Sequence, residues 1–228
     1  MTAMYAVLIA AGLAIDIWFI ATEYAGRMLR ATVLKGLASL MFVLLGLLCY
    51  RSSPTPFGRL IVIGLILGMI GDVLLNMRNL YEGRKSMMVF AAGILAFLSG
   101  HFLYIAALLR RGGPGILLTA LILTAVIAAA SVPPLMKRIS APSKGLKIFG
   151  YVYLVIVIAM FSCAAALLRA DGGTALSAVF TAGGALFMIS DFIMIYYSFG
   201  RKIKPLRAVN LLSYYVGQLL IALCILLA

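Results

Sequence analysis

Charge is scarce in this chain, and acidic charge is scarcer still. Only 11% of the 228 residues are charged, and six acidic residues stand against 19 Lys and Arg. With 65% hydrophobic residues and a mean hydropathy of +1.16, the chain cannot be a water-soluble globular domain. The stretches between its apolar runs are too short for an extramembrane module. We therefore expect one membrane-embedded domain over residues 1–228.

Cysteine and histidine are also rare, which excludes several kinds of site. The three cysteines, Cys49, Cys163 and Cys224, lie in separate apolar runs without the spacing of metal ligands or of a disulfide framework. We expect them to be packing residues, and we expect neither a metal nor a cofactor. The N-terminal run has no basic segment before it and contains Asp16, which favours a retained helix over a cleaved signal peptide.

Eight apolar runs are each about as long as a bilayer crossing requires, roughly 20 residues. They cover residues 3–22, 32–50, 57–77, 87–109, 115–134, 146–168, 174–198 and 208–228. The fifth run is the weakest and is expected to end at Pro133 and Pro134. The sequence thus predicts an all-α polytopic membrane protein with eight transmembrane helices.

The surplus of basic residues follows the order of the runs. Lys and Arg concentrate after the first, third, fifth and seventh runs. By the positive-inside rule these loops are cytoplasmic and both termini lie outside the plasma (inner) membrane. A net charge of +13 would suggest nucleic acid in a soluble protein. Here contact with anionic membrane lipid explains it, so we expect no nucleic-acid partner.

Two aspartates lie inside apolar runs, each in a similar phrase. Asp72 is in residues 69–74 (Met-Ile-Gly-Asp-Val-Leu), and Asp191 is in residues 188–193 (Met-Ile-Ser-Asp-Phe-Ile). A carboxylate inside a bilayer is costly and usually serves a partner, a cavity or a reaction. The structural alternative is that they tie helices together, or form ion pairs with Lys35 and Lys144. We favour a functional role.

The two halves of the chain resemble each other beyond these phrases. Residues 100–106 (Gly-His-Phe-Leu-Tyr-Ile-Ala) are echoed by residues 217–222 (Gly-Gln-Leu-Leu-Ile-Ala), and Lys35-Gly-Leu is echoed by Lys144-Gly-Leu. An even number of helices separates the copies, so they would be related by an axis along the membrane normal. This predicts tandem four-helix repeats, residues 1–111 and 112–228, around a polar cavity.

Helical rise places Asp72, Asp191 and His101 in one layer about 10 Å deep, in the cytoplasmic half and near the midplane. Because lipid offers polar groups no partners, the polar faces near this layer should point inward. The further candidates for cavity lining are Asp16, Lys35, Tyr104, Tyr151, Tyr214 and Gln218. For two of these residues a purely structural role stays open: His101 could bond a neighbouring backbone carbonyl, and Lys35 could reach the interface by snorkelling.

Four short motifs, together with the eight-span layout and Lys35, resemble the YhhN family over essentially the whole chain. The motifs are Gly-Asp at Asp72, His-x-x-Tyr at His101 and Tyr104, Ser-Asp at Ser190 and Asp191, and Tyr-Tyr-x-x-Gln at Tyr214, Tyr215 and Gln218. Characterised members are lysoplasmalogenases, which hydrolyse the vinyl ether bond of lysoplasmalogens to a fatty aldehyde and glycerophosphocholine or glycerophosphoethanolamine. The resemblance implies that Asp72 and Asp191 are the catalytic pair.

The chemistry of a vinyl ether suits this pair. Proton transfer to carbon gives an oxocarbenium ion, water captures it, and the hemiacetal collapses to aldehyde and alcohol. One carboxyl must hold a proton, while the second stabilises the cation and activates water, as paired carboxyls do in glycosidases. Two aspartates in low dielectric should not both ionise. Asp191 lies deeper, so we expect it to be the acid and Asp72 the base.

A one-chain lysophospholipid would place its tail between helices and its phosphate near Arg78, Lys85 or Lys35. The main alternative is a proton-coupled transporter of small molecules or lipids, since tandem repeats with midplane acids suit both functions. Against transport, no helix has paired Gly or Pro interruptions. A non-catalytic lipid-binding scaffold is the third possibility. The oligomeric state does not follow from the sequence.

Overall fold

A computed structural model describes residues 2–140 and 144–228, and this part of the chain is all-helical. The long helices are α1 (Thr2–Tyr24), α2 (Met28–Ser52), α3 (Pro56–Met77), α4 (Gly83–Gly112), α5 (Leu117–Lys137), α6 (Lys144–Ala170), α7 (Ala175–Phe199) and α8 (Lys204–Leu223). Short 3₁₀ segments lie at Arg78–Leu80, Pro114–Ile116 and Cys224–Leu227. Among the described residues, eight helical segments are long and apolar enough to span a membrane. The predicted fold class, an integral membrane protein of eight helices, is confirmed.

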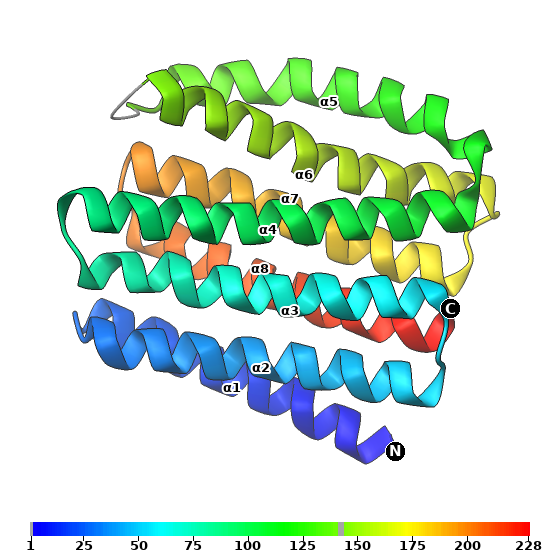
Figure 1. The fold of residues 1–228 in the computed structure, drawn as a ribbon, viewed down its shortest axis with the longest axis horizontal. Coiled ribbons are helices and arrows are strands. Elements are labelled where there is room, and N and C mark those ends of the chain that lie inside the picture. Colours follow the sequence, from blue (N-terminus) through cyan, green and yellow to red (C-terminus); the bar gives the residue numbers. More distant parts are fainter. Residues whose placement is uncertain (1, 141–143) are drawn as a thin grey trace.

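The helices run side by side along the long axis of the molecule (Figure 1). Successive helices pack as neighbours, except α4 and α5. In addition, α2 meets α8, and α4 meets α6. The last residues of α1, α3, α5 and α7 lie together at one end, at the left of Figure 1, and we call this the basic end. Both termini lie at the opposite end, as the count of eight crossings requires.

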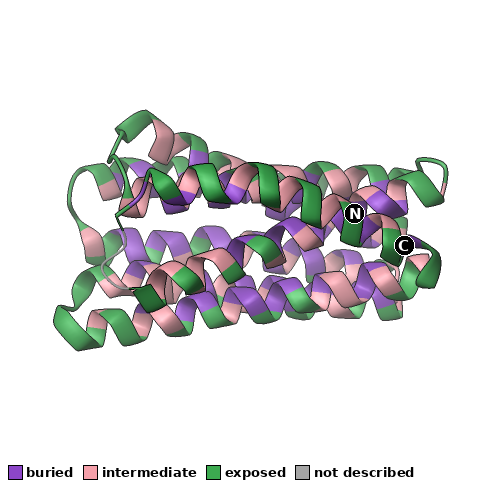
Figure 2. Ribbon diagram, turned by 90° about the horizontal axis from the view of Figure 1, so that it is seen from above, coloured by how far each residue is buried: buried purple, intermediate pink, exposed green. Residues whose placement is uncertain are grey.

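The inward faces of the helices form one large core, and the outward faces expose apolar side chains. Figure 2 shows exposed positions along the outer surface of several helices and buried positions between them. Trp18, Leu118 and Ile148 are each more than half exposed. Such side chains would be a liability in water, whereas a bilayer solvates them without cost.

One predicted boundary is wrong: α5 does not end at its two prolines. Pro133 and Pro134 lie inside the helix, which continues to Lys137. The prolines remove two backbone donors, but their fixed φ is compatible with a helix. In a bilayer the remaining amides have no water to bond, so continuing the helix is the cheapest way to satisfy them. Burial of Val132 and Met136 holds this last turn in place.

Two close helix contacts occupy matching places in the two halves. A Cβ on Gly100 of α4 would lie 3.1 Å from the carbonyl oxygen of Gly64 in α3. A Cβ on Gly217 of α8 would lie 2.8 Å from the carbonyl oxygen of Gly183 in α7. Gly64 precedes Asp72 by the same number of residues as Gly183 precedes Asp191. These contacts support the tandem duplication, which stays a prediction.

We predict that Gly217→Ala loosens the α7–α8 pair. The added methyl group meets backbone atoms that cannot rotate away, so the helices must separate at a cost of about 1–3 kcal/mol. Thermal unfolding in detergent should show a lower midpoint than wild type. Gly115→Ala is the control, because a Cβ there has no neighbour within 4 Å. Equal midpoints for the two variants would show that the contact does not hold the helices together.

Candidate functional site

Asp72 and Asp191 line one cavity between the two halves of the bundle, and its space of about 330 Å³ includes its opening to the surroundings. Side chains from α2, α3, α4, α6, α7 and α8 surround it, and only the peripheral helices α1 and α5 contribute none. Both aspartates are buried, with 1% and 5% of their surfaces exposed. The sequence placed them at similar depth on different helices, and the fold brings them to the same space.

The carboxylate of Asp72 is fully partnered. Its Oδ1 lies 3.1 Å from the ammonium Nζ of Lys35, which is itself 6% exposed. Its Oδ2 accepts hydrogen bonds from Ser39 at 2.6 Å and from Tyr214 at 2.7 Å. An ammonium ion and two hydroxyl donors are what a buried carboxylate needs to remain charged. These contacts therefore favour an ionised Asp72.

A chain of hydrogen bonds extends from Asp72 along α8. The amide nitrogen of Gln218 donates to the Tyr214 hydroxyl at 3.2 Å, and its oxygen accepts from Tyr104 of α4 at 3.3 Å. Tyr215 lies beside this chain, with its hydroxyl 3.2 Å from both Ser39 Oγ and the Lys35 carbonyl oxygen. The predicted polar stripe of α8 thus fixes the position of the Asp72 carboxylate. Buried networks of this kind hold their members in one geometry.

Asp191 has a different environment. Its Oδ2 accepts a hydrogen bond from Tyr153 of α6 at 2.6 Å. Neither of the two ion pairs found among the described residues involves Asp191. The neighbouring Ser190 accepts a hydrogen bond on Oγ from Asn210 at 2.8 Å, so it lines the cavity in a fixed position. One carboxyl therefore has a cation and two donors, and the other has a phenol.

A wide, basic-lined hollow of about 1270 Å³ joins this cavity toward the basic end. The two spaces adjoin at four side chains that line both of them: Lys35, Leu75, Met194 and Arg207. We call this hollow the vestibule. Its cationic lining residues are Lys35, Arg78, Lys202, Lys204 and Arg207.

Arg207 is held in place where the vestibule and the cavity adjoin. It forms a bidentate pair with Glu23 of α1, through Nε at 2.9 Å and Nη2 at 2.8 Å. It also donates to Asn210 Oδ1 at 2.8 Å. Arg78 has no carboxylate within 4 Å among the described residues, and its guanidinium lies 4.5 Å from the centre of the Phe90 ring. Among the described residues Arg78 thus forms no ion pair, and Glu23, which also lines the vestibule, acts on it only at longer range.

Several predicted site residues lie outside the cavity lining. His101 is buried, and its Nδ1 lies 2.7 Å from the backbone carbonyl oxygen of Phe97. This contact is the structural role that the sequence analysis left open for His101. Asp16 is fully buried in α1, and its carboxyl oxygens have no hydrogen-bond partner among the described residues. Tyr151 is half-buried and does not line the cavity; Tyr153, two residues along α6, does.

Lys35 and Lys144, which stand in similar sequence phrases, do not occupy equivalent positions in the structure. Lys144 is the first residue of α6 and is exposed, whereas Lys35 lies about two turns inside α2. The sequence analysis missed Ser39, Tyr153 and Arg207 among the cavity and network residues. Ser39 could have been found, because it lies four residues after Lys35 and so shares its helix face. Nothing local distinguishes Tyr153 from Tyr151.

The described residues contain no cluster of three or more His, Cys, Asp or Glu side chains of the kind that holds a metal ion. The chemistry offered by these side chains is proton transfer between two carboxyls in different environments, beside a basic surface.

Comparison with known proteins gives one match. The model of the YhhN family matches residues 30–225, which include both aspartates, Lys35 and the α8 network. No curated protein and no solved structure matches the chain. The family resemblance drawn from short motifs is therefore confirmed over most of the chain.

We predict that Lys35→Met destabilises the fold strongly. It leaves a buried carboxylate without its cation, which costs about 3–5 kcal/mol. The double variant Lys35→Met/Asp72→Asn should recover much of this loss, because the uncompensated charge is gone. Chemical denaturation in detergent measures both, with the exposed Lys85→Met as control. A double variant no more stable than Lys35→Met would contradict the ion pair.

Proposed function

Because the chain belongs to the YhhN family, we propose that it is a membrane-embedded hydrolase that cleaves the vinyl ether bond of lysoplasmalogens. The products would be a fatty aldehyde and a glycerophosphocholine or glycerophosphoethanolamine. The observation that carries the proposal is that two buried aspartates with different partners line one cavity. Family membership is consistent with a hydrolase, and this geometry supplies the reason to prefer an acid–base reaction.

The partners of the two carboxyls suggest their roles. Asp72 faces Lys35 at 3.1 Å and accepts two further hydrogen bonds, so it serves best as the anion. Asp191 has no cation in ion-pair range among the described residues and accepts from a phenol, so it serves best as the proton donor. Acid and base roles in paired carboxyls are commonly set by such differences in environment.

In the proposed reaction, Asp191 transfers its proton to the vinyl carbon that is not bonded to oxygen. The carbon bonded to oxygen becomes an oxocarbenium ion, which the Asp72 carboxylate stabilises across the cavity. Water, deprotonated as it attacks with Asp72 as base, adds to this carbon and forms a hemiacetal. Collapse of the hemiacetal breaks the carbon–oxygen bond and releases the aldehyde and the glycerol hydroxyl. One water is consumed, and the proton taken up by Asp72 must be returned to Asp191.

The vestibule suits the polar end of such a substrate. Arg78, Lys202 and Lys204 line it and form no ion pair with any of the described carboxylates, and Arg207 lies at its inner end. A phosphodiester bound there would receive charge-assisted hydrogen bonds in a partly desolvated site. By the positive-inside rule we further propose that this basic end faces the cytoplasm of the plasma (inner) membrane. Lys85, which the sequence analysis included, is not part of the vestibule lining.

We predict that Asp72→Asn and Asp191→Asn each lower kcat for aldehyde release by at least about 100-fold, the usual contribution of a general acid or base. The assay uses purified protein in detergent with a lysoplasmalogen and detects the aldehyde. Glu82→Gln is the matched control, because Glu82 is exposed just before α4 and makes no side-chain cap hydrogen bond. Undiminished aldehyde release from either buried-site variant would end the paired-carboxyl mechanism.

A second prediction concerns the phosphate. Arg78→Gln should raise KM about tenfold with little change in kcat, because a lost charge-assisted hydrogen bond is worth roughly 1.5–3 kcal/mol. Arg84→Gln, at an exposed position near the start of α4, should leave both constants unchanged. Steady-state kinetics with the same lipid separates the two. A lowered kcat at unchanged KM would place the phosphate away from Arg78.

The same buried charges would also suit proton-coupled transport, so this alternative is tested beside the hydrolase. The protein is reconstituted in liposomes that contain lysolipid, and a pH gradient is applied across their membrane. Proton-linked flux without aldehyde release would favour the transporter. Aldehyde release that needs no gradient favours the hydrolase.

A further inference from the structure

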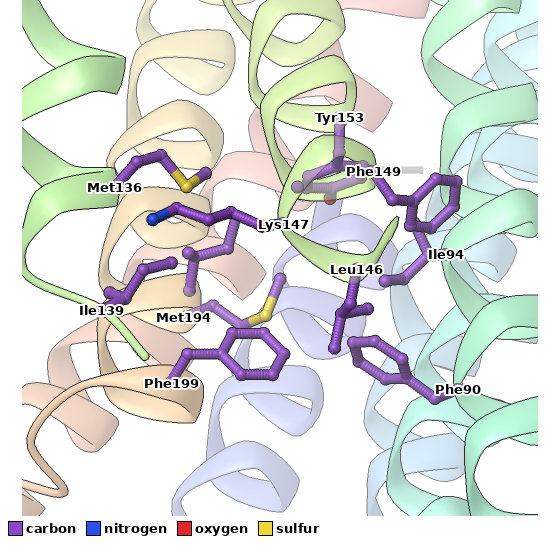
Figure 3. Close-up of a pocket in the computed structure, with 12 residues that line it drawn as sticks. Phe90, Ile94, Met136, Ile139, Leu146, Lys147, Phe149, Tyr153, Met194 and Phe199 are labelled. Carbon is purple, nitrogen blue, oxygen red and sulfur yellow. The ribbon is translucent and has the colours of Figure 1, made fainter. Parts of the chain in front are cut away.

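A separate apolar pocket lies next to the aspartate cavity. It lies between α4, the end of α5, the first half of α6 and the second half of α7, and its space of about 420 Å³ includes its opening to the surroundings. Figure 3 shows Met136 and Ile139 on one side of it and Ile94 and Phe90 on the other. Its lining is hydrocarbon, aromatic or thioether, except for the Tyr153 hydroxyl and the amine of Lys147. We call it the apolar pocket.

Two side chains connect this pocket with the candidate site. Tyr153, which donates its hydrogen bond to Asp191, lines both the apolar pocket and the aspartate cavity. Met194 lines the apolar pocket, the aspartate cavity and the vestibule. The three spaces therefore meet at Met194, beside the carboxyl of Asp191 and one turn of α7 away from it.

The chemistry of each space differs in a way that matches a one-chain lipid. The vestibule is basic, the cavity holds the two carboxyls, and the apolar pocket has almost no polar atoms. Apolar walls bind a flexible hydrocarbon by removing it from more polar surroundings, at roughly 0.8 kcal/mol per buried CH₂. A phosphate or a sugar would lose its hydrogen bonds there.

We propose that the apolar pocket holds the hydrocarbon chain of the lipid substrate, with the reacting bond beside Asp191 and the head group in the vestibule. The inference rests on the proposed function, because it takes the reacting bond to lie at the aspartates. The lipid is then bent at Met194, since both the chain and the phosphate extend from there toward the basic end. From Met194 to Phe199, along α7, the pocket runs about 7.5 Å. It therefore encloses the part of the chain nearest the reacting bond.

Gly150 provides a way to fill the pocket without moving backbone. A Cβ at Gly150 would lie 3.4 Å from the terminal methyl of Met136, across the pocket, with no backbone atom closer. Gly150→Leu should lower kcat/KM for a substrate with a long alkenyl chain at least tenfold. For a substrate whose chain is only a few carbons long, it should change kcat/KM by less than twofold.

Ile148→Phe is the matched control on the same helix. Ile148 is 63% exposed on the outer surface, so added bulk there meets only the surrounding lipid or detergent. It should leave both substrates unaffected. Equal losses with long and short chains in Gly150→Leu, or no loss with either, would overturn the pocket as the chain site.

A binding experiment on the wild-type protein does not depend on that variant folding, or on catalysis. The probe is a one-chain phospholipid with a saturated ether bond, which cannot be hydrolysed by this route, carrying a photoreactive diazirine near the start of its chain. We expect crosslinks at Ile94 and Ile195, which line the pocket and are only 7% and 4% exposed. Crosslinks confined to outward residues such as Leu95 and Ile148 would overturn the proposal.

The two proposals fail in different ways. Crosslinks at Ile94 and Ile195 without any aldehyde release from a lysoplasmalogen would support the pocket as a lipid-chain site and reject the vinyl ether reaction. Aldehyde release without crosslinks in the pocket would keep the reaction and reject the chain site.

Discussion

A carboxylate without water must find its partners within the protein, and the Lys35–Asp72 pair is the contact on which this structure most depends. A lone buried charge would be far costlier than the marginal stability of a fold. The pair draws α2 against α3, and the hydroxyl of Tyr214 brings α8 from the other half to the same carboxylate. One charge thus determines how three helices meet.

The same constraint explains why the two aspartates differ. Only one of them receives an ammonium ion, and the other receives the phenol of Tyr153. Acid–base catalysis needs one group that keeps its proton and one that has lost it. A site with two equally charged carboxylates would repel itself, and one with two neutral carboxyls would lack a base. The asymmetry of the partners therefore matters more for the proposed reaction than the presence of two acids.

The sequence predicts those features that depend on one segment alone, and it does not predict those that depend on how the helices pack. The eight spans and the importance of Asp72 and Asp191 were predictable, because bilayer thickness and the cost of buried charge act on each segment alone. The stripe of Tyr214 and Gln218 followed from helical period. Tyr153 was not predictable over Tyr151, since the choice depends on how α6 is rotated against α7 and α4. The predicted end of α5 at its prolines was wrong. Proline ends a helix less strictly where no water can bond the backbone carbonyls that it leaves without a donor.

The predicted duplication can be compared with the contacts that the two aspartates make. Lys35 and Tyr153 lie at the same distance before the last residues of α2 and α6, Ser52 and Ala170. Each contacts the aspartate of the following helix, so the predicted duplication would pair Lys35 with Tyr153 and not with Lys144. Likewise Phe97 and Tyr214 each precede by three residues the glycines that make the close helix contacts, and only Tyr214 carries a hydroxyl to bond an aspartate. A repeated scaffold would supply two carboxyls, and a few substitutions in one copy suffice to make them chemically different.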